Sequence, residues 1–153
     1  MNIFILDNNP VKAAQMQCDK HVVKMILESA QMLCTIATQQ GFVAPYRPTH
    51  AKHPCTIWTA ESKQNWDWLI THALALCAEY TNRYGKTHKS QQHIEWCKSL
   101  NISLPVVGAT PFAQAMPEQY RNSDPVKAYR AYYKGEKAKF ATWKSKTPSW
   151  WTN

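Results

Sequence analysis

The sequence predicts an all-α fold, a single compact domain over residues 1–153 with three to five helices. A long N-terminal helix is expected at its centre, after a short extended N-terminus. Two observations predict this class. Apolar residues recur at helical spacing in two long stretches, which end at Gly41 and Gly85. In addition, 153 residues with 44% hydrophobic content suffice to bury one substantial core.

The chain begins with an apolar, β-prone run over residues 1–6, for which we expect either a single strand or an extended N-terminus. Asn9 is a helix-capping residue type and Pro10 fits the first helical position, so together they predict a helix start. The predicted helix runs from about residue 10 to about residue 40 and stops at Gly41. A helix of roughly 30 residues is long enough to contain a break.

The middle of the chain predicts a second long helix over residues 56–84, ended by Gly85, and a shorter helix over residues 89–100. Residues 101–123 hold three prolines and a glycine, which predict a long ordered loop with one helical turn near residues 111–115. A loop of that length in a compact domain often covers a site.

The last helix is predicted over residues 126–144, because Asp124 followed by Pro125 is a good helix start. Gly135 is a weak point within it. The tail ends in Trp150 and Trp151, which are expected to be exposed.

One polar stripe runs along the long first helix. With about 3.6 residues per turn, five side chains fall in it, beside Lys20. These five are Gln17, His21, Lys24, Glu28 and Gln31. Apolar residues cover most of the remaining circumference, as in a central helix with a single polar strip. An aligned carboxylate, imidazole and ammonium predict the floor of a binding or catalytic cleft, with Glu28 as general acid or base. The alternative is a basic solvated face on a half-buried helix.

The net charge of +8 and the pI of about 9.3 predict a polyanionic partner, of which nucleic acid is the commonest. Residues 44–55 form a proline-interrupted loop that carries four basic or imidazole side chains. These are Arg47, His50, Lys52 and His53. A stiff loop with such donors predicts phosphate binding, and an exposed basic connector is the alternative.

The five cysteines are widely spaced and include no C-x-x-C pair, which argues against a disulfide framework or a zinc knuckle. The segment H-x-x-H-P-C near residue 50 is not a standard zinc pattern either, so neither a metal nor a cofactor is predicted. No signal peptide or membrane span is visible. A cytoplasmic protein without membrane contact is therefore expected.

Three segments together resemble a known family. The first has Asp19-x-His21 with a glutamate, Glu28, seven residues after the histidine, and follows a short apolar N-terminus. The second is the stretch of residues 53–85, with an aromatic start and central leucines, and the third is the closing Pro-Ser-Trp of residues 148–150. In these features the chain resembles the pyrimidine-dimer DNA glycosylases of the phage endonuclease V type.

The resemblance implies an all-α fold and an activity on DNA. In that family the α-amine of the first residue attacks the sugar carbon of a damaged pyrimidine nucleotide and forms a Schiff base, while the helix glutamate supports proton transfers. By this resemblance the amine is that of Met1, the carboxylate is Glu28, and His21 contacts DNA. An α-amine is partly neutral at physiological pH, which makes it a feasible nucleophile. The family's basic positions before and three residues after the glutamate hold Leu27 and Gln31 here.

The leading hypothesis is a monomeric DNA glycosylase or glycosylase/AP-lyase of phage or bacterial origin, located in the cytoplasm of the cell or of the phage host. It would act on a pyrimidine nucleotide flipped from double-stranded DNA, with Glu28 and Met1 as catalytic residues. The predicted nucleic-acid contacts are Lys20, His21, Lys24, Gln31, Arg47, His50, His53, Arg130 and Lys137. Two alternatives remain open. One is transfer of a small group onto a modified pyrimidine in phage DNA, and the other is nucleic-acid binding without catalysis.

Overall fold

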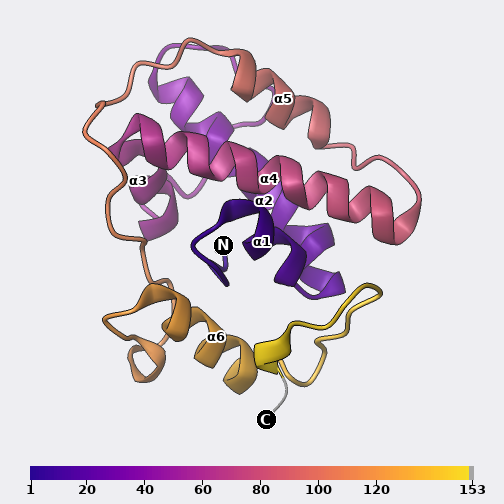
Figure 1. The fold of residues 1–153 in the computed structure, drawn as a ribbon. Helices are drawn as coiled ribbons and strands as arrows, with labels where there is room; N and C mark the ends of the chain where they lie inside the picture. Colours follow the sequence, from indigo (N-terminus) through magenta and orange to yellow (C-terminus); the bar gives the residue numbers. More distant parts are fainter. Residues whose placement is uncertain (152–153) are drawn as a thin grey trace.

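The computed structural model describes residues 1–151, and within them the chain is all-helical with no β-strand (Figure 1). The α-helices are α1 (Pro10–Met16), α2 (Asp19–Gln39), α3 (Pro54–Glu61), α4 (Lys63–Tyr84), α5 (Gln91–Ser99) and α6 (Pro125–Glu136). Two short 3₁₀ turns are η1 (Glu118–Tyr120) and η2 (Ser149–Trp151). The predicted all-α class is confirmed. Six α-helices replace the predicted three to five because each long helix is divided in two.

The first division lies at Gln17 and Cys18, where the backbone is extended. Gln17 therefore leaves the polar stripe predicted for the first helix, and its side chain points into the core. Its amide nitrogen donates to the Ile3 carbonyl at 3.0 Å and lies 3.1 Å from Nε2 of His72. The stripe begins only at α2. The inclusion of Gln17 was wrong because the helical period does not continue across the break.

The second division lies at Ser62, whose backbone is extended and whose hydroxyl accepts a hydrogen bond from the Asn65 N–H at 3.0 Å. Serine is a preferred N-cap residue, so α4 starts anew at this position. At its other end α4 stops at Gly85, which has φ +71°. Only glycine adopts that conformation without steric cost, and the predicted end of this helix is confirmed.

The C-terminal third differs from the prediction in three places. The helical turn forms at η1 after Pro117, while residues 111–115 are not helical. The last helix, α6, ends at Glu136 instead of residue 144, directly after Gly135. The indoles of Trp150 and Trp151 are half-buried rather than exposed, since both rings pack against the core. The Trp150 Nε1–H reaches Sδ of Met16 at 3.4 Å.

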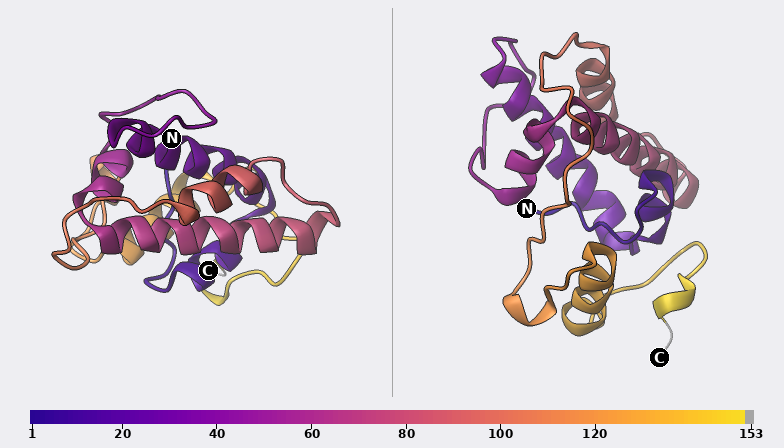
Figure 2. Two further views of the ribbon diagram at one scale, coloured as in Figure 1. Left: turned by 90° about the horizontal axis from the view of Figure 1, so that it is seen from above. Right: turned by 60° about the vertical axis from the view of Figure 1, so that its left-hand side comes forward.

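The start of the chain is extended, with no strand, and it runs through the core. Residues 2–6 are each at most 6% exposed. Figures 1 and 2 show the N-terminus in the space between the α2–α5 layer and α6. Arg130 of α6 donates from Nε to the Leu6 carbonyl at 2.9 Å, and Gln17 holds the Ile3 carbonyl. The rest of the chain therefore fixes the position of the first residue.

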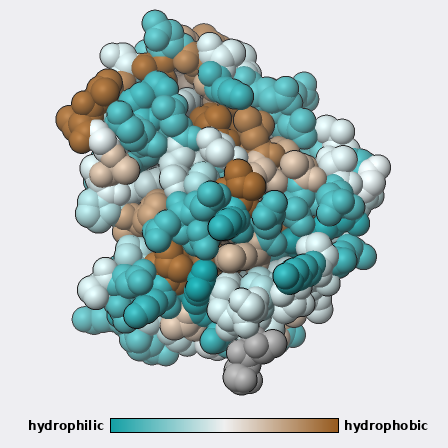
Figure 3. Space-filling view, in the orientation of Figure 1, coloured by the Kyte–Doolittle hydropathy of each residue, from teal (hydrophilic) through white to brown (hydrophobic). Residues whose placement is uncertain are grey.

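Within the described residues, no helix combines the length and the apolar character that crossing a membrane requires. The face in Figure 3 is largely hydrophilic, with small separate hydrophobic patches.

Candidate active site

The α-amine of Met1 lies beside the carboxylate of Glu28. The amine nitrogen is 3.5 Å from Oε1, and the N–H of Asn2 donates to the same oxygen at 3.0 Å. Glu28 is 8% exposed, so most of its surface is shielded from solvent. Lys24, one helical turn earlier, brings its exposed ammonium to 3.9 Å from Oε2. The buried carboxylate thus has a cationic group near each of its oxygens, and the nearer of the two is the α-amine of Met1.

The first two residues are held more firmly than a chain terminus usually is. Asn2 donates from Nδ2 to the Ala115 carbonyl at 2.7 Å, and its Oδ1 accepts from the N–H groups of Ile3 and Phe4 at 2.8 and 3.2 Å. The side chain of Met1 is only 2% exposed although the residue as a whole is half-buried. The exposed surface of Met1 therefore belongs to its main chain, which carries the amine.

His53 lies close enough to this pair for both charges to affect its pKa. It is the N-cap of α3, and its Nδ1 accepts from the Cys55 N–H at 3.0 Å. Burial lowers the pKa of His53, the Met1 ammonium and His50 lower it further, and Glu28 together with the Met1 backbone opposes the shift. His53 is therefore neutral at pH 7. The structure brings a residue of the predicted phosphate-binding loop to the start of the chain.

The rest of that loop lies on the surface. Arg47 and His50 are exposed, and His50 has φ +50° with its Nδ1 2.8 Å from the Thr49 hydroxyl. The loop is tied to α2 through Thr35, which exchanges hydrogen bonds with the backbone of Thr49 at 3.0 and 3.1 Å. This anchoring holds the loop, with Arg47 and His50 exposed on it, beside α2.

His21 has a different environment from Glu28, although both lie on α2. Its ring stacks on Phe4 with centroids 4.3 Å apart, and its Nδ1 lies 2.6 Å from the hydroxyl of Tyr133. Burial lowers the pKa of His21 to about 3, with further lowering by nearby lysines that include Lys137. The imidazole is thus neutral and packed among rings. Phe4 has φ +59°, a strained conformation for a bulky residue, which the surrounding packing maintains.

Lysines surround this aromatic cluster. Lys20 is exposed, with Nζ 4.8 Å from the ring centroid of Phe140, and half-buried Lys137 has Nζ 4.9 Å from that of Tyr132. With Lys24 they form a basic face along α2 and the end of α6. Gln31 is half-buried farther along α2.

Arg130 of α6 makes several contacts within the protein. Besides the Leu6 carbonyl, its guanidinium approaches Asp7 at 3.5 Å and lies 5.3 Å from the centroid of Trp150. These contacts give Arg130 a structural role. A contact with DNA at this position stays a prediction.

Sequence reasoning missed Asn2, Phe4 and Tyr133. No periodicity marks residues of an extended segment, and nothing in the sequence distinguishes Tyr133 from the other tyrosines of α6.

Among residues 1–151, no group of three or more histidine, cysteine or acidic side chains is arranged to hold a metal ion.

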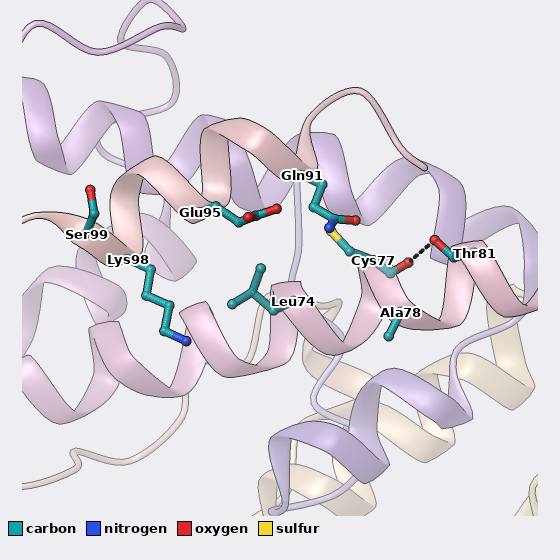
Figure 4. Close-up of a pocket in the computed structure, with 8 residues that line it drawn as sticks. All are labelled: Leu74, Cys77, Ala78, Thr81, Gln91, Glu95, Lys98 and Ser99. Carbon is teal, nitrogen blue, oxygen red and sulfur yellow. Dashed lines mark hydrogen bonds between the residues drawn. The ribbon is translucent and has the colours of Figure 1, made fainter. Parts of the chain in front are cut away.

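One groove of the surface lies away from the Met1 amine. It occupies about 800 Å³ between α4 and α5, and its lining includes Leu74, Cys77, Glu95 and Lys98 (Figure 4). None of its lining residues belongs to the group formed by Met1, Glu28 and His53.

An all-helical fold with a basic face and an ordered α-amine against a carboxylate fits the class of small proteins that act on DNA. The chain belongs to the pyrimidine dimer DNA glycosylase family, whose sequence profile matches residues 1–96. The matched region contains Met1, Glu28 and His53, while α6 lies outside it. No curated protein and no solved structure matches the chain. The predicted family is confirmed, and it suggests a DNA glycosylase-type function on pyrimidine dimers.

Proposed function

We propose that this protein is a DNA glycosylase, or glycosylase/AP-lyase, that uses the α-amine of Met1 as its nucleophile and Glu28 as its proton carrier. Its substrate is a pyrimidine nucleotide flipped from double-stranded DNA. The observation that carries the proposal is the distance of 3.5 Å between the Met1 nitrogen and Oε1 of Glu28. A primary amine and a carboxylate at hydrogen-bonding range form the nucleophile-and-base pair that covalent catalysis requires.

The chemistry follows from these two groups. The neutral amine attacks C1′ of the sugar, a C1′–N bond forms, and the glycosidic bond breaks with its electron pair leaving on the base. Opening of the C1′–O4′ bond then yields a Schiff base. Glu28 takes the proton that the amine loses, because it is the carboxylate next to that amine, and passes it to O4′ as the ring opens, which restores the carboxylate. In the lyase step the same carboxylate accepts the C2′ proton, and the electrons of that C–H bond expel the 3′ phosphate.

Binding to DNA is assigned to the basic face. Lys20, Lys24 and Lys137 offer ammonium groups to phosphates, while Arg47 and His50 extend the contact from the loop before α3. Phosphate contacts of this kind position a protein on the duplex without reading its sequence. His21 is neutral and largely buried, so it would add to the shape of this face rather than to its charge.

Borohydride trapping tests the proposal. Duplex DNA that holds a pyrimidine dimer or an abasic site is incubated with the protein, and borohydride reduces any Schiff base to a stable protein–DNA adduct. We expect an adduct with the natural chain and at least about 100-fold slower formation with Glu28→Gln, because a general acid–base is worth about 10²–10⁴-fold. Glu118→Gln, which changes an exposed glutamate of η1, is the matched control and should trap normally.

DNA binding without adduct formation would contradict the proposal. If DNA binds and no adduct forms under any of these conditions, the amine mechanism is wrong. Nucleosides that gain mass, in place of lost bases, would then support group transfer to a pyrimidine.

A further inference from the structure

Two consecutive nitrogens at the start of the chain approach the same oxygen of Glu28. The α-amine of Met1 lies 3.5 Å from Oε1, and the N–H of Asn2 donates to this oxygen at 3.0 Å. The two nitrogens are joined through the Cα and the carbonyl carbon of Met1, and the peptide unit that contains the second nitrogen is planar. The position of Asn2 therefore limits where the amine lies relative to the carboxylate.

The side chain of Asn2 fixes that position. Its Nδ2 donates to the Ala115 carbonyl at 2.7 Å, and its Oδ1 accepts from the N–H groups of Ile3 and Phe4 at 2.8 and 3.2 Å. One end of this side chain must donate and the other end must accept, so only one orientation of the amide satisfies all three bonds. Asn2 is 6% exposed, and burying its amide without these partners would be unfavourable.

The segment that receives the Asn2 side chain is itself fixed by Tyr129 of α6. The Tyr129 hydroxyl accepts from the Ala115 N–H at 3.2 Å and donates to the Ala113 carbonyl at 2.8 Å. Tyr129 is completely buried, so water does not compete for its hydroxyl. These three residues lie outside the region that the family profile matches, which ends at residue 96. A part of the chain beyond the matched region thus holds the first peptide unit in place.

We propose that Asn2 is a positioning residue for the α-amine of Met1. Its side chain attaches the first peptide unit to residues 113–115, and Tyr129 attaches those residues to α6. Asn2 acts through the amine and has no part in the bonds that form or break. The catalytic consequence rests on the function proposed above, whereas the anchoring of residue 2 is a property of the folded chain without DNA.

Asn2→Ser tests the anchor. Serine retains an acceptor for the N–H groups that follow it and is too short to donate to the Ala115 carbonyl. Borohydride trapping is measured in a single turnover, with the protein in saturating excess over DNA. We expect a rate about tenfold lower or less at unchanged DNA affinity, since misplacing a reacting group by about 1 Å costs up to about 100-fold. Asn101→Ser makes the same change at an exposed asparagine and is the matched control.

Tyr129→Phe tests the second step of the anchor, because it removes the hydroxyl that holds residues 113 and 115. This variant should also trap DNA more slowly than the natural chain, at temperatures well below its melting temperature. In the Asn2→Ser background, Tyr129→Phe should have no further effect on trapping, because the segment reaches the amine only through Asn2. Losses at independent sites would add, so this double-mutant cycle distinguishes one coupled anchor from two separate structural defects.

A second readout does not depend on catalysis. Relaxation of ¹⁵N nuclei measures the order of the backbone N–H of residue 2 in the protein without DNA. Its order parameter should be about 0.85 in the natural chain, the value of rigid backbone, and should fall below about 0.6 in Asn2→Ser. Asn101→Ser should leave it unchanged. The N–H groups of α2 should stay rigid in both variants, which shows that the fold is intact.

The two readouts distinguish the possible failures. An unchanged order parameter of residue 2 in Asn2→Ser would overturn the anchor, and trapping at the natural rate in that variant would overturn the positioning role. A lower order parameter in a protein that never traps DNA would support the anchor and contradict the proposed function. Losses of trapping rate that add in the double variant would show two separate structural effects and would also overturn the proposal.

Discussion

The two ends of the polar face of α2 have opposite surroundings. At one end, the Glu28 carboxylate lies 3.5 Å from the amine of Met1, with the ammonium of Lys24 also nearby. At the other end, two helical turns earlier, His21 stacks on Phe4 and bonds to Tyr133 in a neutral aromatic cluster. Both residues belong to one stripe of the sequence pattern. Only Glu28 lies beside the α-amine.

The difference comes from what the rest of the chain brings to each end. The start of the chain and the N-cap of α3 meet Glu28, whereas the Phe4 ring and α6 cover His21. Helical periodicity assigns a residue to a face, but distant segments decide whether that face holds an ion or a packed ring. The following predictions test this contrast, from the largest expected effect to the smallest.

Extending the N-terminus by Gly-Ser should have the largest effect. The added residues convert the Met1 amine into an amide and move the new amine away from Glu28. Borohydride trapping should fall at least about 100-fold, because the reacting group is no longer in position. DNA binding should persist, and the same dipeptide added after Asn153 serves as the control. An N-terminally extended protein that traps at the natural rate would contradict the assignment of the nucleophile.

The His21 imidazole, at the other end of the polar face of α2, should contribute to the pH dependence of the free energy of unfolding. Folding lowers the pKa of His21 from 6.5 to about 3, so within this range the unfolded chain binds a proton that the folded chain does not. The free energy of unfolding should therefore fall as pH falls below 6.5, by about 1.4 kcal/mol per pH unit for this group.

Burial lowers the pKa of His72 to about 4, which adds a contribution of the same sign. Urea titrations between pH 6.5 and 5 avoid most carboxylate titration and measure the combined slope. His21→Asn should reduce this slope. An unchanged slope in that variant would show that His21 is protonated in the folded protein.

Tyr133→Phe should weaken the fold without slowing the chemistry. The hydroxyl lies 2.6 Å from Nδ1 of His21 and accepts from the Cys18 N–H at 3.1 Å, so its loss leaves buried polar groups without a partner. Denaturant unfolding should show a loss of about 2 kcal/mol. Trapping well below the melting temperature should stay at the natural rate. Tyr80→Phe is the control, with an expected change within about 0.5 kcal/mol. Slower trapping at full stability would give Tyr133 a catalytic role.

Lys24→Gln should have the smallest effect. The Lys24 side chain is 66% exposed, so its ion pair with Glu28 contributes little to stability. If Lys24 contacts a phosphate, the slope of log K against log salt should decrease by about 1 in magnitude. Lys98→Gln, on α5, should leave this slope unchanged. An unchanged slope for Lys24→Gln would remove this residue from the DNA-binding surface.

The sequence predicted those features that depend on local pattern. Gly85 marks the end of α4 because only local backbone conformation is involved, and the spacing of His21 and Glu28 indicated both the helix face and the family. The length of the first helix allowed for a break, but its place at Gln17 was not predictable, because it depends on the buried contacts of that side chain with Ile3 and His72.

The meeting of Met1, Glu28 and His53 depends on contacts between segments far apart in the sequence. Residues 1 and 28 are joined by the path of an extended segment through the core, and residue 53 arrives through the loop anchored at Thr35. Periodicity carries no information on such a path. The resemblance to the family supplied the pairing of amine and carboxylate, and nothing in the pattern indicated the place of His53 beside them.

The most direct test locates the covalent bond. The trapped adduct is digested with protease and nuclease, and tandem mass spectrometry identifies the nitrogen that carries the sugar remnant. The account predicts that the remnant lies on the α-nitrogen of Met1, within 3.5 Å of Glu28 in the free protein. A remnant on the ε-nitrogen of Lys24 or of any other lysine would contradict it.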